Sequence, residues 1–264
     1  VKGNFVLFGF FVFVQGVNRM AIIEVKNLTK IYGSGDTQVT ALDSVNISIE
    51  EGQFVAVMGP SGCGKSTLLH LIGGLDRPSD GTICIEGKDI SKMSDKTLTE
   101  MRRRKMGFVF QFFNLLPVLD AVENTALPLI LDGVKPAEAR SKAREWLAQN
   151  KLEDRGSHLP NELSGGQQQR VAIARAMVSD PLIVLADEPT GNLDSRSGDE
   201  IASSLRKVVS VWGRTVLMVT HDPRIAAYAD RIIFLKDGKV LDDTMLDGSN
   251  RENARRLKEK VEAL

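Results

Sequence analysis

Short apolar stretches recur along the chain and predict β-strands of two kinds. Some alternate apolar and polar residues, as strands do when one face is buried and the other meets water: Ile22–Val25, Val45–Ile49 and Thr82–Ile85. Others are continuously apolar, which is typical of parallel strands covered on both faces: Phe54–Met58, Gly107–Phe110, Leu182–Ala186 and Thr215–Val219. Near the end of the chain, Arg231–Leu235 and Lys239–Leu241 flank Asp237-Gly238, which favours a tight hairpin turn.

Helical segments lie between these strands. The pattern predicts helices over Ser66–Leu75, Thr97–Lys105, Ala137–Gln149 and, as a charged and exposed tail, Asn253–Leu264. From residue 112 to about 163 the chain is expected to be mostly helical, with helix boundaries at its prolines, Pro117, Pro128, Pro136 and Pro160. Tyr32–Asp36 predicts a flexible glycine-rich loop. Strands that alternate with helices predict an α/β sandwich around a mostly parallel sheet, and the helical stretch predicts a second lobe.

Length, charge and cysteine content limit the domain count, the binding partners and the cellular compartment to be expected. The 264 residues are enough for one large α/β domain with a substantial core. The 34 basic and 34 acidic side chains cancel, so the overall charge gives no reason to expect binding to nucleic acid or to an anionic membrane surface. The two cysteines are too few for a disulfide framework, which fits a reducing cytosolic compartment.

The N-terminus does not fit the α/β pattern. Phe5–Val14 is apolar but too short to span a bilayer, and no small-residue cleavage site follows it. We interpret residues 1–20 as a hydrophobic extension that does not belong to the fold, with Met20 as the true start and the residues before it upstream of that start. A hydrophobic anchor or an interfacial segment is the alternative interpretation.

A phosphate-binding loop follows the apolar run Phe54–Met58. The pattern G-x-x-x-x-G-K-[ST] is matched in full, and a predicted helix follows it. Glycines let backbone N–H groups curl around phosphates, and the helix N-terminus adds a favourable dipole. Lys65 is expected to bridge the β- and γ-phosphates and the Ser66 hydroxyl to ligate Mg²⁺. The expected nucleotide contacts are Gly59, Pro60, Ser61, Gly62, Cys63, Gly64, Lys65, Ser66 and Thr67.

Polar side chains mark the ends of three further apolar strands. Asp187 lies where open α/β sheets bind ligands, at the carboxyl edge, and can hold the Mg²⁺ hydration shell. Glu188 comes next and points elsewhere, so it can address an attacking water. His221 would reach the γ-phosphate, and the Gln111 amide could contact the metal and the water. Taken alone, each of these residues is also compatible with a structural or solvated role.

The segment Leu163–Gln167, LSGGQ, combines a serine, two glycines and a helix start, but it lies too far along the chain to be a second loop for the same phosphates. In this order, the phosphate loop, LSGGQ, Asp187-Glu188 and His221 resemble the ATP-binding cassette (ABC) family. The resemblance covers residues 21 to about 243. It implies a P-loop NTPase fold, α/β, with a mostly parallel core sheet, an antiparallel β subdomain and a helical subdomain at about 112–165. Residues 244–264 would then be a charged C-terminal tail.

The resemblance also implies an ATPase that works as a homodimer, with two ATP molecules held head to tail between the copies. The ATP bound by one copy would be capped by Ser164, Gly165, Gly166 and Gln167 of the other, with Asp194 in the loop that crosses the interface. The catalytic residues would be Glu188, His221, Gln111 and Lys65, with Glu188 as general base or as the group that orients water. Ser66, Gln111 and Asp187 would form the metal site. Tyr32 would stack on adenine; packing of this loop tyrosine on the sheet is the alternative.

Within the family, the chain is most similar to the subgroup that serves lipoprotein-release and macrolide-type export. Three segments carry this finer match: Gln111–Pro117 (QFFNLLP), Leu163–Arg170 (LSGGQQQR) and Ala186–Ser195 (ADEPTGNLDS). The resemblance implies a separate integral-membrane permease and a peripheral location on the cytoplasmic face of the inner (plasma) membrane. The permease is expected to dock near Phe112, Phe113, Leu115 and Leu116, with interior packing of these residues as the alternative.

Other functions were weighed against this one. A cell-division-type ABC ATPase that signals through a membrane partner would share nearly all of these motifs. A soluble ABC ATPase acting on ribosomes or DNA usually carries two cassettes or long insertions, and a P-loop kinase has no use for LSGGQ. No nucleic-acid partner is expected, because the basic run Arg102–Lys105 lacks interleaved aromatic residues and predicts a solvated helix face.

Overall fold

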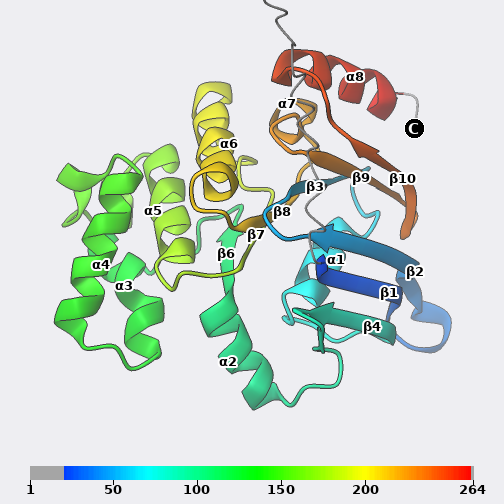
Figure 1. The fold of residues 1–264 in the computed structure, drawn as a ribbon, viewed down its shortest axis with the longest axis horizontal. Helices are drawn as coiled ribbons and strands as arrows, with labels where there is room; N and C mark the ends of the chain where they lie inside the picture. The colour runs from blue at the N-terminus through cyan, green and yellow to red at the C-terminus, as the bar shows by residue number, and fades with distance from the viewer. Residues whose placement is uncertain (1–20, 263–264) are drawn as a thin grey trace, which may run out of the picture.

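The computed structural model describes residues 21–262, so the interpretation of residues 1–20 lies outside the described residues. Two sheets and a helical lobe make up the described chain (Figure 1). The strands are β1 (Ala21–Tyr32), β2 (Val39–Glu50), β3 (Phe54–Met58), β4 (Asp80–Ile85), β5 (Lys88–Asp89), β6 (Met106–Phe110), β7 (Ile183–Asp187), β8 (Thr215–Val219), β9 (Arg231–Lys236) and β10 (Lys239–Met245). The α-helices are α1 (Lys65–Ile72), α2 (Asp95–Lys105), α3 (Ala121–Leu131), α4 (Pro136–Gln149), α5 (Gly165–Met177), α6 (Ser195–Ser210), α7 (Pro223–Ala226) and α8 (Asn250–Glu262). Short 3₁₀ turns are η1 (Gly35–Thr37), η2 (Glu153–Arg155) and η3 (Pro160–Glu162).

The core sheet has six strands in the order β10-β9-β3-β8-β7-β6. Every pair is parallel except β10 with β9, which form the hairpin expected at Asp237-Gly238. The continuously apolar runs therefore do become parallel strands. Successive residues of each strand point to opposite faces, so Val55 and Val57 join one hydrophobic core while Ala56 and Met58 join another.

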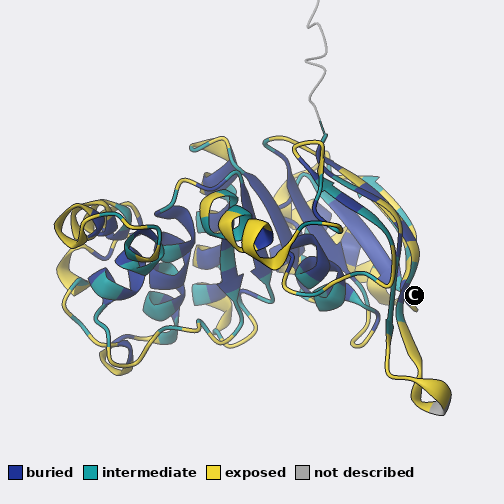
Figure 2. Ribbon diagram, turned by 90° about the horizontal axis from the view of Figure 1, so that it is seen from below, coloured by how far each residue is buried: buried dark blue, intermediate teal, exposed yellow. Residues whose placement is uncertain are grey.

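Different layers cover the two faces of the core sheet. On one face, α1 packs together with the antiparallel sheet β2-β1-β4-β5, whose Ile23, Leu28 and Ile49 are fully buried. On the other face lie α6, α7 and α8 (Figure 1). The loop between β1 and β2 projects from the body and is exposed (Figure 2). The prediction of an antiparallel β subdomain beside a mostly parallel sheet is confirmed.

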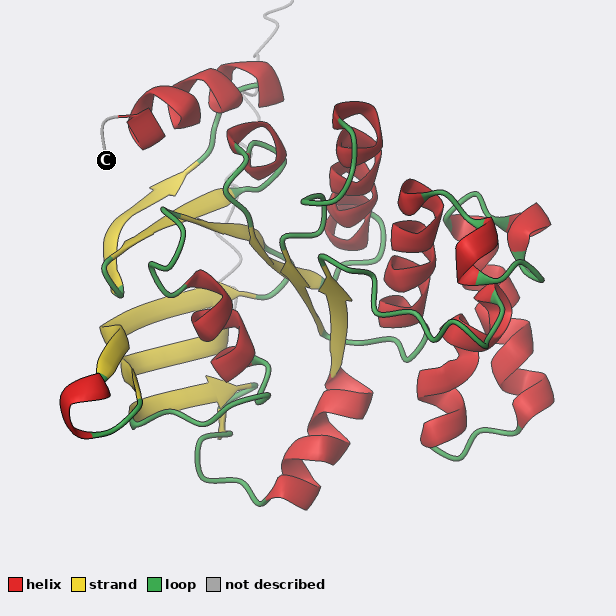
Figure 3. Cartoon of the chain, turned by 180° about the vertical axis from the view of Figure 1, so that it is seen from behind, coloured by secondary structure: helices red, strands yellow, loops and turns green. Residues whose placement is uncertain are grey.

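The helical lobe consists of α3, α4 and α5; α3 and α4 lie beside the core sheet, whereas α5 also packs on it through Ile173, Ala176 and Met177 (Figure 3). Asp120 begins α3 with a capping box: its carboxylate accepts from the Glu123 N–H, and the Glu123 carboxylate accepts from the Asp120 N–H. Ala139, Ala143 and Leu147 recur at helical spacing on α4 and are buried in the core of the lobe. The lobe thus has its own hydrophobic centre.

Several helix boundaries differ from the sequence pattern by one to three residues, and two of the differences have a clear cause. Helix α1 ends at Ile72, not Leu75, because Gly73 and Gly74 follow it and Gly74 has a φ of 61°. Pro128 lies inside α3 and is not a boundary, so that prediction was wrong. Proline removes only its own N–H from the helix, and the Pro128 carbonyl still accepts from the Asp132 N–H at 3.1 Å, so the helix continues past it.

The C-terminal helix α8 is charged, as predicted, but the expectation that it is simply exposed was wrong. Asn253 and Leu257 are buried, and Leu257 joins the core beneath α7. Lys260 pairs with Asp242 of β10 and lies over the Phe234 ring. The helix therefore packs along one apolar stripe. Within the described chain, every helix falls short of the length or apolarity needed to cross a bilayer.

Candidate functional site

The phosphate loop joins the buried strand β3 to α1 and forms a hollow at the end of the core sheet. Gly64 begins α1 with a φ of 102°, and a Cβ at this position would lie 2.4 Å from the Ala41 carbonyl oxygen. Only glycine fits there, so the close approach of β2 to the loop depends on it. The hollow measures about 270 Å³ and is lined by Ala41, Ser61, Gly62, Gly64, Lys65, Ser66, Thr67 and Glu188.

Lys65 is buried within the loop that it is expected to serve. Its Nζ donates to the carbonyl oxygens of Gly59 at 2.9 Å and Pro60 at 2.8 Å. The ammonium therefore holds the loop in its curled shape and stands at the wall of the hollow. A phosphate that entered the hollow would meet this ammonium together with the N–H groups at the start of α1.

Cys63 packs under the loop and does not line the hollow. Its thiol is buried and lies 4.0 Å from Lys65 Nζ, and burial raises the pKa of the thiol. Because the thiolate is the reactive species, a raised pKa lowers reactivity at neutral pH. Cys84 on β4 is also a free thiol but is only half-buried.

We expect a bulky maleimide to modify the half-buried Cys84 before the buried Cys63. ATP binding should be lost only when Cys63 is modified, because an adduct on Cys63 would displace the phosphate loop. Bound ATP should protect Cys63. Intact-mass analysis alongside nucleotide binding measures this, with the Cys63→Ala and Cys84→Ala variants separating the two thiols. Unchanged ATP affinity after confirmed modification of Cys63 would show that its surroundings tolerate the adduct.

Ser66 and Asp187 meet across the hollow, although they are far apart in sequence. The Ser66 hydroxyl donates to Asp187 Oδ1 at 2.9 Å. On the other side of the carboxylate, His70 Nε2 lies 3.4 Å from Oδ2, and this contact raises the pKa of the imidazole. A hydroxyl beside a carboxylate is an all-oxygen donor set, which is what Mg²⁺ prefers. The residues present therefore fit the predicted metal.

Glu188 follows Asp187 and lines the hollow. Its φ is 45°, a left-handed conformation that costs a non-glycine residue energy and persists only where surrounding contacts impose it. Its N–H donates to the Val219 carbonyl at 3.0 Å, and its Oε2 lies 3.0 Å from His221 Nδ1. The His221 side chain is 70% exposed, so it is free to contact a ligand as well.

Gln111 lies beside the loop that follows Asp187-Glu188. Its Nε2 contacts Asn192 Oδ1 at 3.4 Å, and Asn192 Nδ2 donates back to the Gln111 carbonyl at 3.0 Å. A Cβ on Gly191 would lie 2.8 Å from Nε2 at the end of the flexible Gln111 side chain, so the two residues are closely packed. Gln111 does not line the hollow of about 270 Å³ and makes no contact with Ser66 or Asp187 within the described chain. Its role as a metal ligand stays a prediction.

The LSGGQ segment forms the N-terminus of α5, outside the phosphate hollow of its own chain. Ser164 and Gln167 form a capping box, with the Gln167 N–H donating to Ser164 Oγ at 3.3 Å and the Ser164 N–H donating to Gln167 Oε1 at 2.9 Å. The two glycines face the start of α6 and the loop before it: a Cβ on Gly165 would lie 3.1 Å from Leu193 in the loop, and one on Gly166 would lie 3.3 Å from Ser197 in the first turn of α6.

Asp194 caps α6 next to this segment. Its Oδ1 accepts from the N–H groups of Arg196 and Ser197, both at 3.0 Å, and its Oδ2 accepts from the Ser197 hydroxyl at 2.7 Å. These bonds, led by the Ser197 N–H, hold the pKa of Asp194 below its usual range. The two segments predicted to act on the partner's ATP therefore lie side by side at two helix N-termini.

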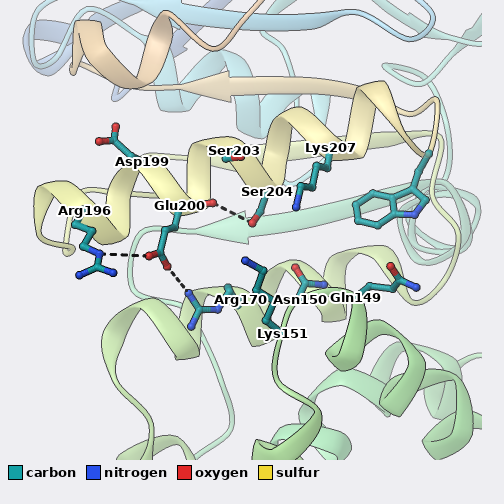
Figure 4. A pocket seen from close by; sticks show the side chains of 11 residues that line it. Gln149, Asn150, Lys151, Arg170, Arg196, Asp199, Glu200, Ser203, Ser204 and Lys207 are labelled. Carbon is teal, nitrogen blue, oxygen red and sulfur yellow. Dashed lines mark hydrogen bonds and ion pairs between the residues drawn. The ribbon is translucent and has the colours of Figure 1, made fainter.

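A polar groove of about 720 Å³ lies between α6 and the helical lobe (Figure 4). Side chains reach across this groove and join α6 to α5 of the lobe. Arg170 of α5 reaches across to Glu200 of α6 at 2.9 Å, and Arg196 approaches the same carboxylate at 3.7 Å. At the other end, the rings of Trp146 and Trp212 meet edge to face, with centroids 5.0 Å apart. A movement of the lobe would thus carry the ends of α5 and α6 together.

Tyr32 ends β1 and lies close to the end of the phosphate loop. Its hydroxyl donates to Asp76 Oδ2 at 2.8 Å and also contacts Thr67. Lys30 Nζ lies 4.7 Å from the ring centroid and donates to Asp76 Oδ1 at 2.8 Å. Burial, then the bond to Asp76, raises the pKa of the phenol. Tyr32 is 42% exposed, and adenine stacking on it stays a prediction.

The residues predicted to receive a permease do not share one environment. Phe112 is 72% exposed and Leu116 is also exposed, whereas Leu115 packs against the core of the helical lobe. Phe113 is half-buried, and its carbonyl accepts from Arg175 at 2.7 Å. A separate apolar hollow of about 430 Å³ lies nearby, between β6, α2 and α3. Its apolar lining residues include Leu75, Phe108, Phe110, Leu127, Pro128 and Leu131.

The basic run at the end of α2 is solvated only in part: the Arg104 side chain is 62% exposed and that of Arg103 is 31% exposed, and the run also makes specific contacts. Arg102 donates to the Gly74 carbonyl, and Arg103 donates to the Leu131 carbonyl at 2.8 Å. Arg103 and Arg104 also share Asp132, and Lys105 lies 3.5 Å from Glu86. Arg103 and Arg104 thus tie α2 to the end of α3, whereas Arg102 contacts the turn after α1 and Lys105 contacts the turn after β4. Arg102 and Arg103 also border the apolar hollow.

Several residues that connect the lobes were missed. Gln169 of α5 is fully buried and donates to the carbonyls of Phe110 at 3.1 Å and Pro189 at 2.6 Å. Arg175 of α5 donates to the carbonyls of Phe113 and Asn114. Both residues follow LSGGQ on α5. A polar residue among the apolar residues of this helix could have indicated a buried hydrogen-bonding role. His70 and Asp76 carried no such signal.

Together, the fold and these side chains define a P-loop nucleotide hydrolase with a helical lobe inserted after β6. The sequence model of the family described as "ABC transporter" matches residues 42–191. The chain belongs to this family. It is an ATP-binding cassette ATPase that powers a membrane transporter, and the predictions of family, fold class and ATPase activity are confirmed.

Individual relatives agree with this assignment. A solved dimeric structure of the ATP-binding cassette MJ0796 of Methanocaldococcus jannaschii, in a post-hydrolysis state bound to ADP and Pi, has a TM-score of 0.79 and 48% identity, covering 86% of this chain and 99% of that one. The lipoprotein-releasing system ATP-binding protein LolD of Geobacter metallireducens is 48% identical over 84% of this chain and 99% of its own length. The macrolide export ATP-binding/permease protein MacB of Hyphomonas neptunium is 48% identical over 84% of this chain, which spans 34% of that protein.

Proposed function

We propose that this chain drives a separate integral-membrane permease of the lipoprotein-release or macrolide-export type from the cytoplasmic face of the membrane. The observation that carries the proposal is the position of LSGGQ and Asp194, adjacent to each other and outside the phosphate hollow of their own chain. The similarity to the LolD and MacB ATP-binding regions supports the transport branch.

Within one chain, the hollow binds the triphosphate of ATP. Lys65 would release the carbonyls of Gly59 and Pro60 and donate to the β- and γ-phosphate oxygens instead. Ser66 and Asp187 would hold Mg²⁺, which neutralises charge on the phosphates. Glu188 would orient the attacking water and accept its proton, with His221 fixing the glutamate and contacting the γ-phosphate.

Two copies would complete two such sites. The N-terminus of α5 offers the Ser164 hydroxyl and unpaired N–H groups, which suit the γ-phosphate bound by the other copy. The dimeric ADP- and Pi-bound state of the MJ0796 cassette supports this arrangement. Closure would draw α6 and the helical lobe, which includes α5, toward the partner, and the pairing of Arg170 with Glu200 would join their movements.

The apolar hollow between β6, α2 and α3 is the proposed docking site for a cytoplasmic helix of the permease. Leu131 is 64% exposed at its edge, and Phe112 and Leu116 extend the exposed apolar surface along the segment that follows Gln111. An exposed apolar hollow with a basic border suits an amphipathic helix that carries acidic residues. The hollow borders β6, and Gln111 directly follows this strand. Docking of the permease helix would therefore be coupled to Gln111.

Affinity capture from native membranes tests this proposal. The bait is the full chain carrying Glu188→Gln, held with ATP and Mg²⁺, and mass spectrometry identifies what it retains. We expect a permease with a large extracytoplasmic domain. A small division-type membrane protein would favour signalling instead, and retention of no membrane protein would contradict the proposal.

A second pair of baits locates the docking site. Leu131→Glu should lower permease recovery about tenfold or more, because a charge placed in an interface hot spot commonly costs that much. Val211→Glu is the matched control: Val211 is 67% exposed but follows α6, away from the apolar hollow. Equal recovery with both variants would exclude the hollow as the docking site.

A further inference from the structure

His70 occupies a defined position relative to the proposed metal site. It follows Ser66 by one turn of α1, so both side chains lie on the same face of the helix. Leu68, Leu69 and Leu71 are buried in the core, whereas the His70 side chain is 39% exposed and faces the end of β7. The helix therefore presents two polar groups, one turn apart, to Asp187.

Each oxygen of the Asp187 carboxylate contacts one of these groups. Ser66 Oγ donates to Oδ1 at 2.9 Å, and His70 Nε2 lies 3.4 Å from Oδ2. The second contact is long, and it is attractive only when Nε2 carries a proton, because an ionised carboxylate only accepts hydrogen bonds. In the part of the chain that the structure describes, no other side chain is hydrogen-bonded to Asp187 or paired with it. The orientation of the carboxylate thus depends on α1.

We propose that His70 is a positioning residue that holds Asp187 in the orientation in which it receives Mg²⁺, an inference that rests on the proposed magnesium site. If Mg²⁺ takes over Oδ1 and the Ser66 hydroxyl, His70 becomes the remaining anchor of the carboxylate. Groups that hydrogen-bond a metal-binding carboxylate in this way commonly contribute 10–100-fold to metal affinity. A half-exposed pair of this kind contributes little to folding stability.

The test compares nucleotide affinity with saturating Mg²⁺ and with EDTA, using a fluorescent, non-hydrolysable ATP analogue. The ratio of the two affinities measures the coupling between metal and nucleotide. We expect His70→Ala to lower this ratio about tenfold while the affinity in EDTA stays unchanged. His70→Gln keeps an N–H donor and should recover most of the loss. His158→Ala, a histidine of the helical lobe remote from Asp187, should match the unmodified chain.

Electron paramagnetic resonance with Mn²⁺ in place of Mg²⁺ gives a second readout, and the melting temperature of each ligand-free variant reports folding. An unchanged ratio in His70→Ala, with a lowered ratio in Asp187→Asn, would overturn the positioning role while leaving the magnesium site intact. Equal losses of affinity with Mg²⁺ and with EDTA, not recovered in His70→Gln, would show a packing role and overturn it too. A ratio of one in the unmodified chain and in Asp187→Asn would overturn the magnesium site itself.

Discussion

Replacing Glu188 by glutamine is expected to slow ATP hydrolysis by about 10²–10⁴-fold while ATP binding is retained, because general-base assistance contributes that much. Glutamine has the shape of glutamate but cannot accept the proton of the attacking water. The side chain lies in the phosphate hollow and 3.0 Å from His221, so the substitution should leave the geometry of the site in place. Phosphate release and equilibrium binding of labelled ATP measure the two quantities.

The same variant should accumulate as a dimer when ATP and Mg²⁺ are present, since the step that separates the copies is blocked. Light scattering after size-exclusion chromatography detects this. Glu51→Gln is a suitable control, because Glu51 is an exposed residue of the turn between β2 and β3. Normal turnover in Glu188→Gln would remove Glu188 from the mechanism, whereas loss of ATP binding would mean that its carboxylate shapes the hollow.

Replacing Lys65 by alanine is expected to abolish ATP binding. The ammonium makes two hydrogen bonds to loop carbonyls, at 2.9 and 2.8 Å, and would make comparable bonds to phosphates. Hydrogen bonds to charged groups contribute about 1.5–3 kcal/mol each, so losing two weakens binding by roughly 10²-fold or more. The variant also leaves the carbonyls of Gly59 and Pro60 without their donor, which disturbs the loop.

Isothermal titration calorimetry with ATP measures the loss, and the melting temperature of the ligand-free chain shows whether the fold survives. Lys65→Arg is the informative companion, since it keeps the charge but has a planar group that fits the curled loop poorly. The ATP affinity of Lys65→Arg should lie between that of the unmodified chain and that of Lys65→Ala. Full ATP affinity in Lys65→Ala would refute the role assigned to the phosphate loop.

The features that sequence predicted well are local ones. The phosphate loop is a contiguous strand–loop–helix unit, and its pattern of glycines reflects backbone conformations such as the φ of 102° at Gly64. The apolar runs of β3, β7 and β8 have no polar face, which allows little besides burial on both sides of a sheet. Asp187 and Glu188 were placed at the sheet edge for the same reason.

The errors concern segments whose environment is set by distant parts of the chain. The pattern of α8 is charged enough to be called exposed, yet Leu257 fits against α7. The basic end of α2 suggests solvation, yet Asp132 and the Leu131 carbonyl arrive from α3. In both cases a partner that is remote in sequence provides the contact, and propensity alone does not indicate it.

By itself, the sequence determined the class of this protein, the order of its functional segments and the chemistry that each can perform, because these depend on residue types within short stretches. Only the tertiary structure decided which segments meet. The order β3-β8-β7 in the sheet brings Ser66 and His70 to Asp187, and the packing of α5 against α6 brings LSGGQ beside Asp194. Strand order and helix packing are collective outcomes of burying one shared core, so no single stretch of sequence encodes them.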